Sequence, residues 1–91
     1  MSETIFEKYV ERYELDNVES QIVKMPKHAK IITAFAEGNK IFMWALVKPR
    51  NGFEERRVKI YGESSKVMAV AEQYISTIKI NGEFLHVFAD Q

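Results

Sequence analysis

The sequence predicts a mainly β domain, a compact small sandwich or roll of about six or seven mostly antiparallel strands with one short helix. Three observations lead to this fold class. Turn sequences recur along the whole chain, apolar and polar residues alternate between many of them, and the apolar runs are rich in β-branched residues. Short strands separated by closely spaced turns are typical of all-β sandwiches and barrels.

The size and composition fit one globular domain. The chain has 91 residues, of which 46% are hydrophobic and 29% charged. We expect a single β-rich domain over residues 10–91, preceded by an N-terminal extension over residues 1–9. The chain has no cysteine, which excludes a disulfide framework and a thiol nucleophile and favours a reducing compartment. It shows neither a signal peptide nor a long apolar run, so we expect a cytoplasmic protein outside the membrane.

Two hairpin turns are the clearest local signals. Gly38-Asn39 and Asn81-Gly82 each separate two apolar runs. Asn-Gly is favoured in a type I′ turn because both central residues of that turn need a positive φ. The segment around Pro26 and the segment 48–52 provide two further breaks. The strands expected between these breaks are residues 21–25, 30–36, 41–48, 55–61, 74–80 and 84–88.

Two segments have a helical apolar spacing. In residues 64–74 the apolar side chains recur at helical intervals after Ser64, a suitable N-cap, so we expect a short helix over about Ser65 to Gln73. Near the N-terminus, residues 5–13 also fit a helix. The alternative there is a strand over residues 10–15.

The expected strand 41–48 is apolar on both faces. Such a strand lies in the middle of a covered sheet or at an interface between copies of the chain. We therefore expect Trp44 to be at least mostly buried. Phe84 and Phe88 add further apolar surface on another strand, and a short chain has little material to cover every sheet face. These features predict a homodimer or a larger homo-oligomer.

Charge is balanced overall but uneven along the chain. The net charge is zero, yet residues 21–59 carry nine basic residues against three acidic ones. Arg57, Lys59 and Tyr61 share one face of an expected strand, with Arg50 or Arg56 expected at its rim. This is either the solvated face of a sheet or a surface for an anionic partner, such as an acidic protein or a nucleotide.

The sequence carries no pattern of catalytic chemistry. Its two histidines, His28 and His86, lack ligand spacing, its serines lack a nucleophile context, and Gly62 has no phosphate-loop pattern around it. We expect no enzymatic activity, no metal and no cofactor. Trp44 is either a core residue or an interface anchor, and His86 is either a half-buried strand residue or a contact to a ligand.

A series of short motifs runs from about Val10 to Ala89. They are Arg12 to Asp16, Ser20-Gln21, Met25 to Ile31, Trp44 to Val47, Arg57 to Gly62, Tyr74 to Thr77 and Leu85 to Phe88. In this order and spacing they resemble a family of small uncharacterised proteins of tailed bacteriophages, a domain of unknown function.

The resemblance implies a compact all-β fold and an accessory role in a phage. It transfers no activity and no catalytic residue. It favours a strand over residues 10–15, paired with residues 21–25. The chain departs from the family pattern at His28, where a glycine is usual, and at residues 63–65, where the family has a threonine-glycine-histidine loop.

Three functions follow as hypotheses. The first is a non-enzymatic phage accessory protein that binds a host or phage protein in the host cytoplasm and inhibits a defence or takeover target. The second is an oligomer that sequesters a nucleotide-like signal in a pocket lined by Arg57, Tyr61, Trp44 or His86. The third is a single-stranded nucleic-acid binder that uses an exposed aromatic face.

Overall fold

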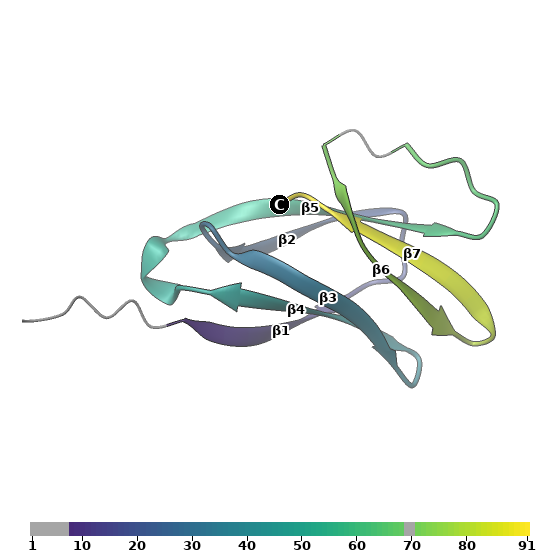
Figure 1. Cartoon of the computed structure of the whole chain (residues 1–91), viewed down its shortest axis with the longest axis horizontal. Helices are drawn as coiled ribbons and strands as arrows, with labels where there is room; N and C mark the ends of the chain where they lie inside the picture. Colours follow the sequence, from purple (N-terminus) through teal and green to yellow (C-terminus); the bar gives the residue numbers. More distant parts are fainter. Residues whose placement is uncertain (1–7, 69–70) are drawn as a thin grey trace, which may run out of the picture.

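The computed structural model describes residues 8–68 and 71–91 and arranges them in two β-sheets (Figure 1). The elements are β1 (Tyr9–Leu15), β2 (Ser20–Pro26), β3 (Lys30–Glu37), β4 (Lys40–Val47), a single 3-10 turn η1 (Pro49–Asn51), β5 (Phe53–Gly62), β6 (Gln73–Ile80) and β7 (Glu83–Ala89). The predicted all-β class is confirmed. β1 begins at Tyr9, one residue before the expected strand.

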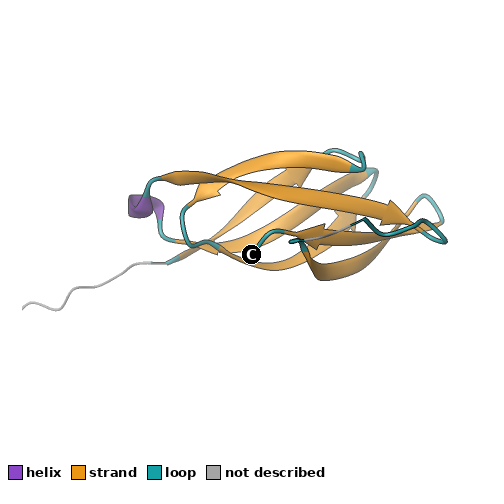
Figure 2. Cartoon of the chain, turned by 90° about the horizontal axis from the view of Figure 1, so that it is seen from above, coloured by secondary structure: helices purple, strands orange, loops and turns teal. Residues whose placement is uncertain are grey.

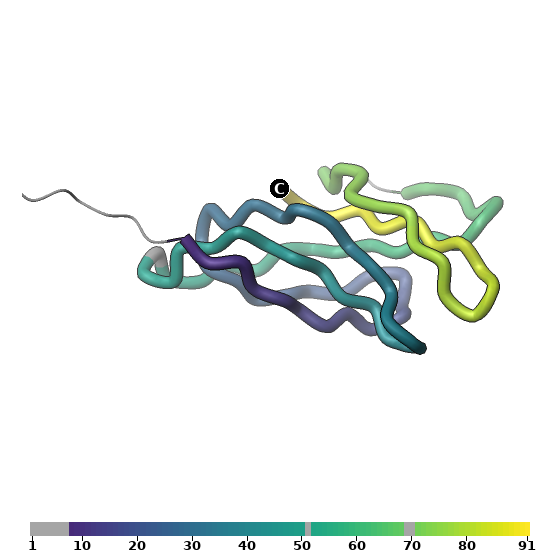
Figure 3. The backbone as a smooth tube through the Cα atoms, turned by 60° about the horizontal axis from the view of Figure 1, so that its bottom comes forward, coloured from purple at the N-terminus to yellow at the C-terminus, as the bar shows by residue number. Residues whose placement is uncertain are grey.

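The strands form a three-stranded sheet in the order β1-β4-β3 and a four-stranded sheet in the order β2-β5-β7-β6. Every neighbouring pair is antiparallel. Figure 3 shows β1, β4 and β3 lying side by side as one layer of the molecule. The two sheets pack face to face, which makes the domain a sandwich.

The expected pairing of the first two strands was wrong. β1 pairs with β4 and β2 pairs with β5, so the first two strands belong to different sheets. The side chain of Gln21 explains the change of sheet. Its Nε2 donates to the carbonyl of Asp16 at 2.7 Å and its Oε1 accepts from the Asp16 amide at 3.0 Å. The side-chain amide of Gln21 thus bonds both backbone groups of Asp16, which would otherwise pair with a neighbouring strand, and the two strands diverge after the turn.

Both predicted hairpins are confirmed. Gly38 has a φ of 62° in the turn between β3 and β4. Asn81 and Gly82 have φ angles of 50° and 79° between β6 and β7, the left-handed pair that a type I′ turn needs.

Two described residues that are not glycine have a left-handed backbone outside the two hairpin turns. His28 has a φ of 64° in the turn between β2 and β3. Ser64, in the segment after β5, also has a φ of 64°. The chain thus keeps a backbone conformation that favours glycine while it carries side chains there.

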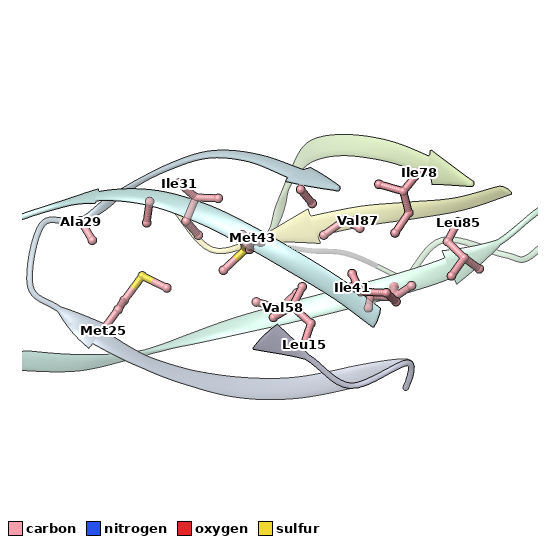
Figure 4. Packing of buried hydrophobic residues seen from close by; sticks show 14 of the residues in the cluster. Leu15, Met25, Ala29, Ile31, Ile41, Met43, Val58, Ile78, Leu85 and Val87 are labelled. Atoms are coloured by element: carbon pink, nitrogen blue, oxygen red, sulfur yellow. The ribbon is translucent and has the colours of Figure 1, made fainter. Parts of the chain in front are cut away.

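The core lies between the sheets, and Figure 4 shows the labelled side chains of both sheets directed into it. Met43 and Val47 of β4 are fully buried, as are Met25 of β2, Val58 of β5 and Val87 of β7. These side chains alternate along each strand with residues of the outer faces, as the period of a strand requires.

The edge strands β3 and β6 approach each other and close one side of the sandwich. Ser76 Oγ accepts a hydrogen bond from the Ala34 amide at 2.9 Å and lies 2.9 Å from Thr33 Oγ1. Each strand has a register shift at this point, between Ile31 and Thr33 in β3 and between Tyr74 and Ser76 in β6. These irregularities turn the two edges toward each other.

The predicted helix over residues 65–73 was wrong for the described part of that segment. Residues 65–68 form no regular element, and Gln73 already belongs to β6, while residues 69–70 lie outside the described residues. Both backbone groups of Met68 bond to side chains of β5, its carbonyl to Lys59 and its amide to Tyr61. Figure 2 shows how little helix the described chain contains. None of its helical structure is long and apolar enough to cross a membrane.

Candidate functional site

The predicted strand face exists on β5. Val58 and Ile60 point into the core, and the alternating positions Arg57, Lys59 and Tyr61 point outward. These three side chains therefore lie on the outer face of the four-stranded sheet. The strand register places Ile22 opposite Arg57, Phe88 opposite Lys59 and His86 opposite Tyr61.

The described residues after β5 contact two of these three side chains; Figure 1 shows the chain here at the upper right, on its way from β5 to β6. Tyr61 is buried, and its hydroxyl accepts a hydrogen bond from the Met68 amide at 3.1 Å. Lys59 Nζ donates to the Met68 carbonyl at 3.0 Å and lies 3.5 Å from Glu72 Oε1. Tyr61 and Lys59 thus hold this segment in place, and the positive charge of Lys59 is balanced within the chain.

Arg57 stays exposed. Its guanidinium forms neither a hydrogen bond nor an ion pair with another residue in the described parts of the chain. Beside it, Ile22 is 49% exposed. We call the outer surface of the four-stranded sheet around it the Arg57 face. Its exposed apolar and basic members are Ile22, Lys24, Phe53, Arg57, Tyr74, Lys79 and Phe84, and the exposed acidic Glu55 lies among them, opposite Lys24.

Two lysines on the Arg57 face lie over aromatic rings. Lys24 Nζ is 5.5 Å from the ring centre of Phe53, and Lys79 Nζ is 5.5 Å from that of Phe84. Phe53 and Phe84 are themselves 59% and 43% exposed. The face therefore combines cations with exposed aromatic surface, which is a common composition of protein interfaces.

The expected position of Arg56 was wrong. Arg56 points into the protein and is only 5% exposed. Its Nε donates to Glu54 Oε2 at 2.6 Å, and its terminal nitrogens donate to the carbonyls of Asp90 at 3.0 Å and Ala29 at 2.8 Å. The hydrogen bond from Arg56 is the main effect and lowers the pKa of Glu54; burial opposes it, and the charge of Arg56, the backbone of His28 and the charge of His28 add smaller lowering effects. Arg56 is thus a structural cation.

Two other predicted residues lie away from this face. Arg50 belongs to η1, which precedes the start of β5, whereas Arg57, Lys59 and Tyr61 lie toward the end of that strand. Trp44 lies on β4 in the other sheet; most of its surface is buried, as expected, but it faces outward and lies outside the core between the sheets. Its strand neighbours Met43 and Ala45 fill the core, which leaves the even-numbered residues of β4 on an outer face.

A polar chain beside the Arg57 face links three residues, of which the sequence singled out only His86. Thr77 Oγ1 lies 2.7 Å from the Tyr74 hydroxyl and 2.9 Å from His86 Nδ1. The Phe88 ring packs edge-on against Tyr61 and Tyr74, with ring centres 5.7 Å apart in each pair. The register shift in β6 brings Tyr74 and Thr77 here, and no local sequence pattern indicates it. This set of five residues is the His86 cluster.

The His86 cluster offers ring faces and hydroxyl groups, a chemistry suited to stacking and hydrogen bonding with a planar ligand. Within residues 8–68 and 71–91, no three histidine, aspartate or glutamate side chains converge in a way that could hold a metal ion.

Comparison with known proteins gives a family but no activity. No curated protein and no solved structure matches the chain significantly. The sequence does match a family defined as a domain of unknown function, DUF7352, over residues 6–91. Because this match includes every strand of both sheets, the protein belongs to the DUF7352 family.

Proposed function

We propose that the protein is a non-enzymatic binding protein of phage origin that acts in the host cytoplasm by covering a functional surface of a host protein. The Arg57 face is the contact surface. The observation that carries this proposal is the exposed Arg57 guanidinium, which has no partner in the described chain and lies beside exposed apolar side chains. A planar guanidinium with free N–H groups suits a carboxylate of the partner.

The surroundings of Arg57 support a protein partner. Arginine and aromatic residues are enriched where protein interfaces gain most of their binding energy, and contiguous exposed apolar surface marks interaction sites. The Arg57 face has an exposed arginine, and its apolar residues Ile22, Phe53, Tyr74 and Phe84 are all more than two-fifths exposed. The resemblance to small tailed-phage proteins supports the phage origin and, with it, a host target.

A capture experiment tests the proposal. The immobilised protein is exposed to host lysate, and retained proteins and small molecules are identified by mass spectrometry. We expect a specific host protein on the wild type and its loss on Arg57→Glu. Lys66→Glu makes the same charge change at an exposed residue outside the Arg57 face and should retain the partner. A folded Arg57→Glu variant that retains the same partner in the same amount would refute the assignment.

Arg57 is a cleaner target than Lys59 for this test. Lys59 holds the segment near Met68 and Glu72, so its substitution changes that segment as well as the surface charge. Arg57 has no such internal contact among the described residues, so its charge reversal should leave the free energy of unfolding within about 0.5 kcal/mol.

The His86 cluster favours a second candidate function, the binding of a nucleotide-like anion. Aromatic rings and the Thr77–His86 hydrogen bond lie here, and the exposed Lys79 follows Thr77 by two residues on the same face of β6. NMR titration with nucleotides separates the two candidates. A nucleotide ligand should shift the signals of the His86 cluster, lose affinity in His86→Ala and keep it in Arg57→Glu. Retention on oligonucleotides that weakens as salt rises would instead indicate a nucleic-acid binder.

A further inference from the structure

The outer face of the three-stranded sheet is aromatic at its centre. Phe35 stacks on Phe42 and on Trp44, with ring centres 5.4 Å and 5.6 Å apart. The Arg12 guanidinium carbon lies 4.6 Å from the ring centre of Phe42. Phe42 is buried, Trp44 and Phe35 are half-buried, and Val10 at the margin is 56% exposed. We call this surface the aromatic face.

Charged residues surround the aromatic centre in an ordered way. The register aligns Arg12 with Trp44 and Glu14 with Phe42 on one side of β4. On the other side, Lys30 is aligned with Leu46 and Glu37 with Lys40. Both sides of β4 therefore carry one basic and one acidic residue, and on each side the basic residue lies nearer the Leu46 end of the strand.

This order is self-complementary. Consider a two-fold axis that lies parallel to the face, runs across the three strands and passes over Met43. It places the Trp44 row of one copy on the Phe42 row of another. Arg12 then faces Glu14 of the second copy, and Lys30 faces Glu37. The remaining charged residue, Lys40, faces Leu46 and can lay its aliphatic stem along it.

We infer that the aromatic face binds a second copy of the chain in a two-fold dimer with this axis. The charge pattern identifies a second copy of the chain as the partner of this face. A single two-fold rotation pairs each of Arg12, Glu14, Lys30 and Glu37 with an opposite charge, and it places the Trp44 row of one copy over the Phe42 row of the other. An apolar centre with a polar rim is the usual anatomy of an interface, and symmetric dimers are the commonest assemblies. The dimer uses the sheet opposite the Arg57 face and is independent of the proposed function.

The dimer should be weak. The face extends from Lys40 to Leu46 along β4, about 20 Å at the usual rise per residue, and is three strands wide. An interface of this extent lies at the small end of the range for specific complexes. We therefore expect dissociation in the micromolar range.

Paired charge reversals test the arrangement. Arg12→Glu should weaken the dimer at least about tenfold, because it places two acidic residues opposite each other, and Glu14→Arg should do the same with two basic residues. An equimolar mixture of these two variants should associate, since every position near the axis then faces an opposite charge. Sedimentation over a range of concentrations measures the dissociation constants. Lys66→Glu and Glu63→Arg make the same charge changes away from this face and should dimerise like the wild type.

Trp44 provides an independent signal, because it is the only tryptophan in the chain. Its emission should shift to shorter wavelength as the wild type dimerises, and the mixture should reproduce this shift. Where Arg12 variants fail to fold, Lys30→Glu and Glu37→Lys provide the equivalent pair. A wild type that stays monomeric into the millimolar range would overturn the inference, as would a mixture of folded variants that does not associate. Arg12→Glu should still capture a lysate partner, because that experiment tests the Arg57 face on the other sheet. Failure of the dimer and failure of the proposed function can therefore be told apart.

Discussion

Two adjacent arginines show how strongly the position of a side chain decides its role. Arg56 points inward and donates to Glu54, Asp90 and Ala29, and Arg57 points outward. Arg56→Met leaves two carbonyls and a carboxylate without their donor, so it should reduce the free energy of unfolding by roughly 2–4 kcal/mol. Arg57→Met is the matched control and should change it by less than about 0.5 kcal/mol. Urea unfolding measures both, and equal losses would contradict the assignment of roles.

The same ion pair predicts an effect of pH. Arg56 lowers the pKa of Glu54 from its ordinary value of 4.5, so the unfolded chain takes up the proton more readily than the folded one. The stabilisation is therefore present above pH 4.5 and is lost as the pH falls through the folded pKa. Glu54→Gln should be less stable than the wild type at neutral pH, and the difference should narrow in acid. Urea unfolding of both proteins at neutral and at acidic pH checks this. A difference in the free energy of unfolding that does not change with pH would argue against the Arg56–Glu54 ion pair.

At this scale the sequence predicts the direction of a side chain better than its contacts. The alternation along β5 correctly places Val58 and Ile60 inside and Arg57 outside. The same alternation places Arg56 inside, but its charge led us to expect it at the rim of the outer face. The two carbonyls that accept its hydrogen bonds lie 27 and 34 positions away in the chain. No local pattern can reveal contacts between such distant residues.

At the scale of elements, the turn after β2 contains a residue in an unfavourable backbone conformation. His28 is left-handed there, with a φ of 64°, although it is not a glycine. His28→Gly should raise the free energy of unfolding by about 0.5–1 kcal/mol, because relief of the backbone strain outweighs the greater freedom of glycine in the unfolded chain. His28→Ala removes the same ring but keeps the strain, so it should give no such gain. Thermal unfolding compares the three proteins, and equal melting temperatures for the two variants would contradict this account.

Strands and hairpins were predictable, and sheet membership was not. Asn81-Gly82 specifies its own turn because the signal is local. The partner of β1 depends instead on the Gln21 side chain and on β4, far along the chain. The sequence around Met68 has helical spacing, but the Met68 backbone bonds to Lys59 and Tyr61 of β5, and these tertiary hydrogen bonds override the local preference. The Arg57 face was therefore predicted in part. Of the His86 cluster, the sequence indicated Tyr61 and His86 but not their neighbours, because the cluster forms across three strands.

At the scale of the whole molecule, the sandwich has one interior and two outer faces. Neighbouring residues of β4 point alternately into the interior and toward one outer face. Met43 is fully buried, so Met43→Ala should cost about 2–5 kcal/mol. Trp44 is half-buried on the aromatic face, so Trp44→Ala should cost at most about 2 kcal/mol in the monomer despite the larger side chain removed. Chemical denaturation at low protein concentration measures both. A loss for Trp44→Ala that exceeds the loss for Met43→Ala would place the tryptophan in the core.

The strand order also has a consequence for the kinetics of folding. The hairpins β3–β4 and β6–β7 close over two-residue turns. In contrast, β2 and β3 separate β1 from its partner β4 in the chain, and the β3–β4 hairpin separates β2 from its partner β5. Loop closure favours the hairpins, so we expect them in the transition state, with the N-terminal strands docking afterwards. Asn81→Ala should then slow refolding, whereas Leu15→Ala should mainly accelerate unfolding. Stopped-flow chevron plots distinguish the two effects, and slow refolding of Leu15→Ala would indicate that β1 docks early.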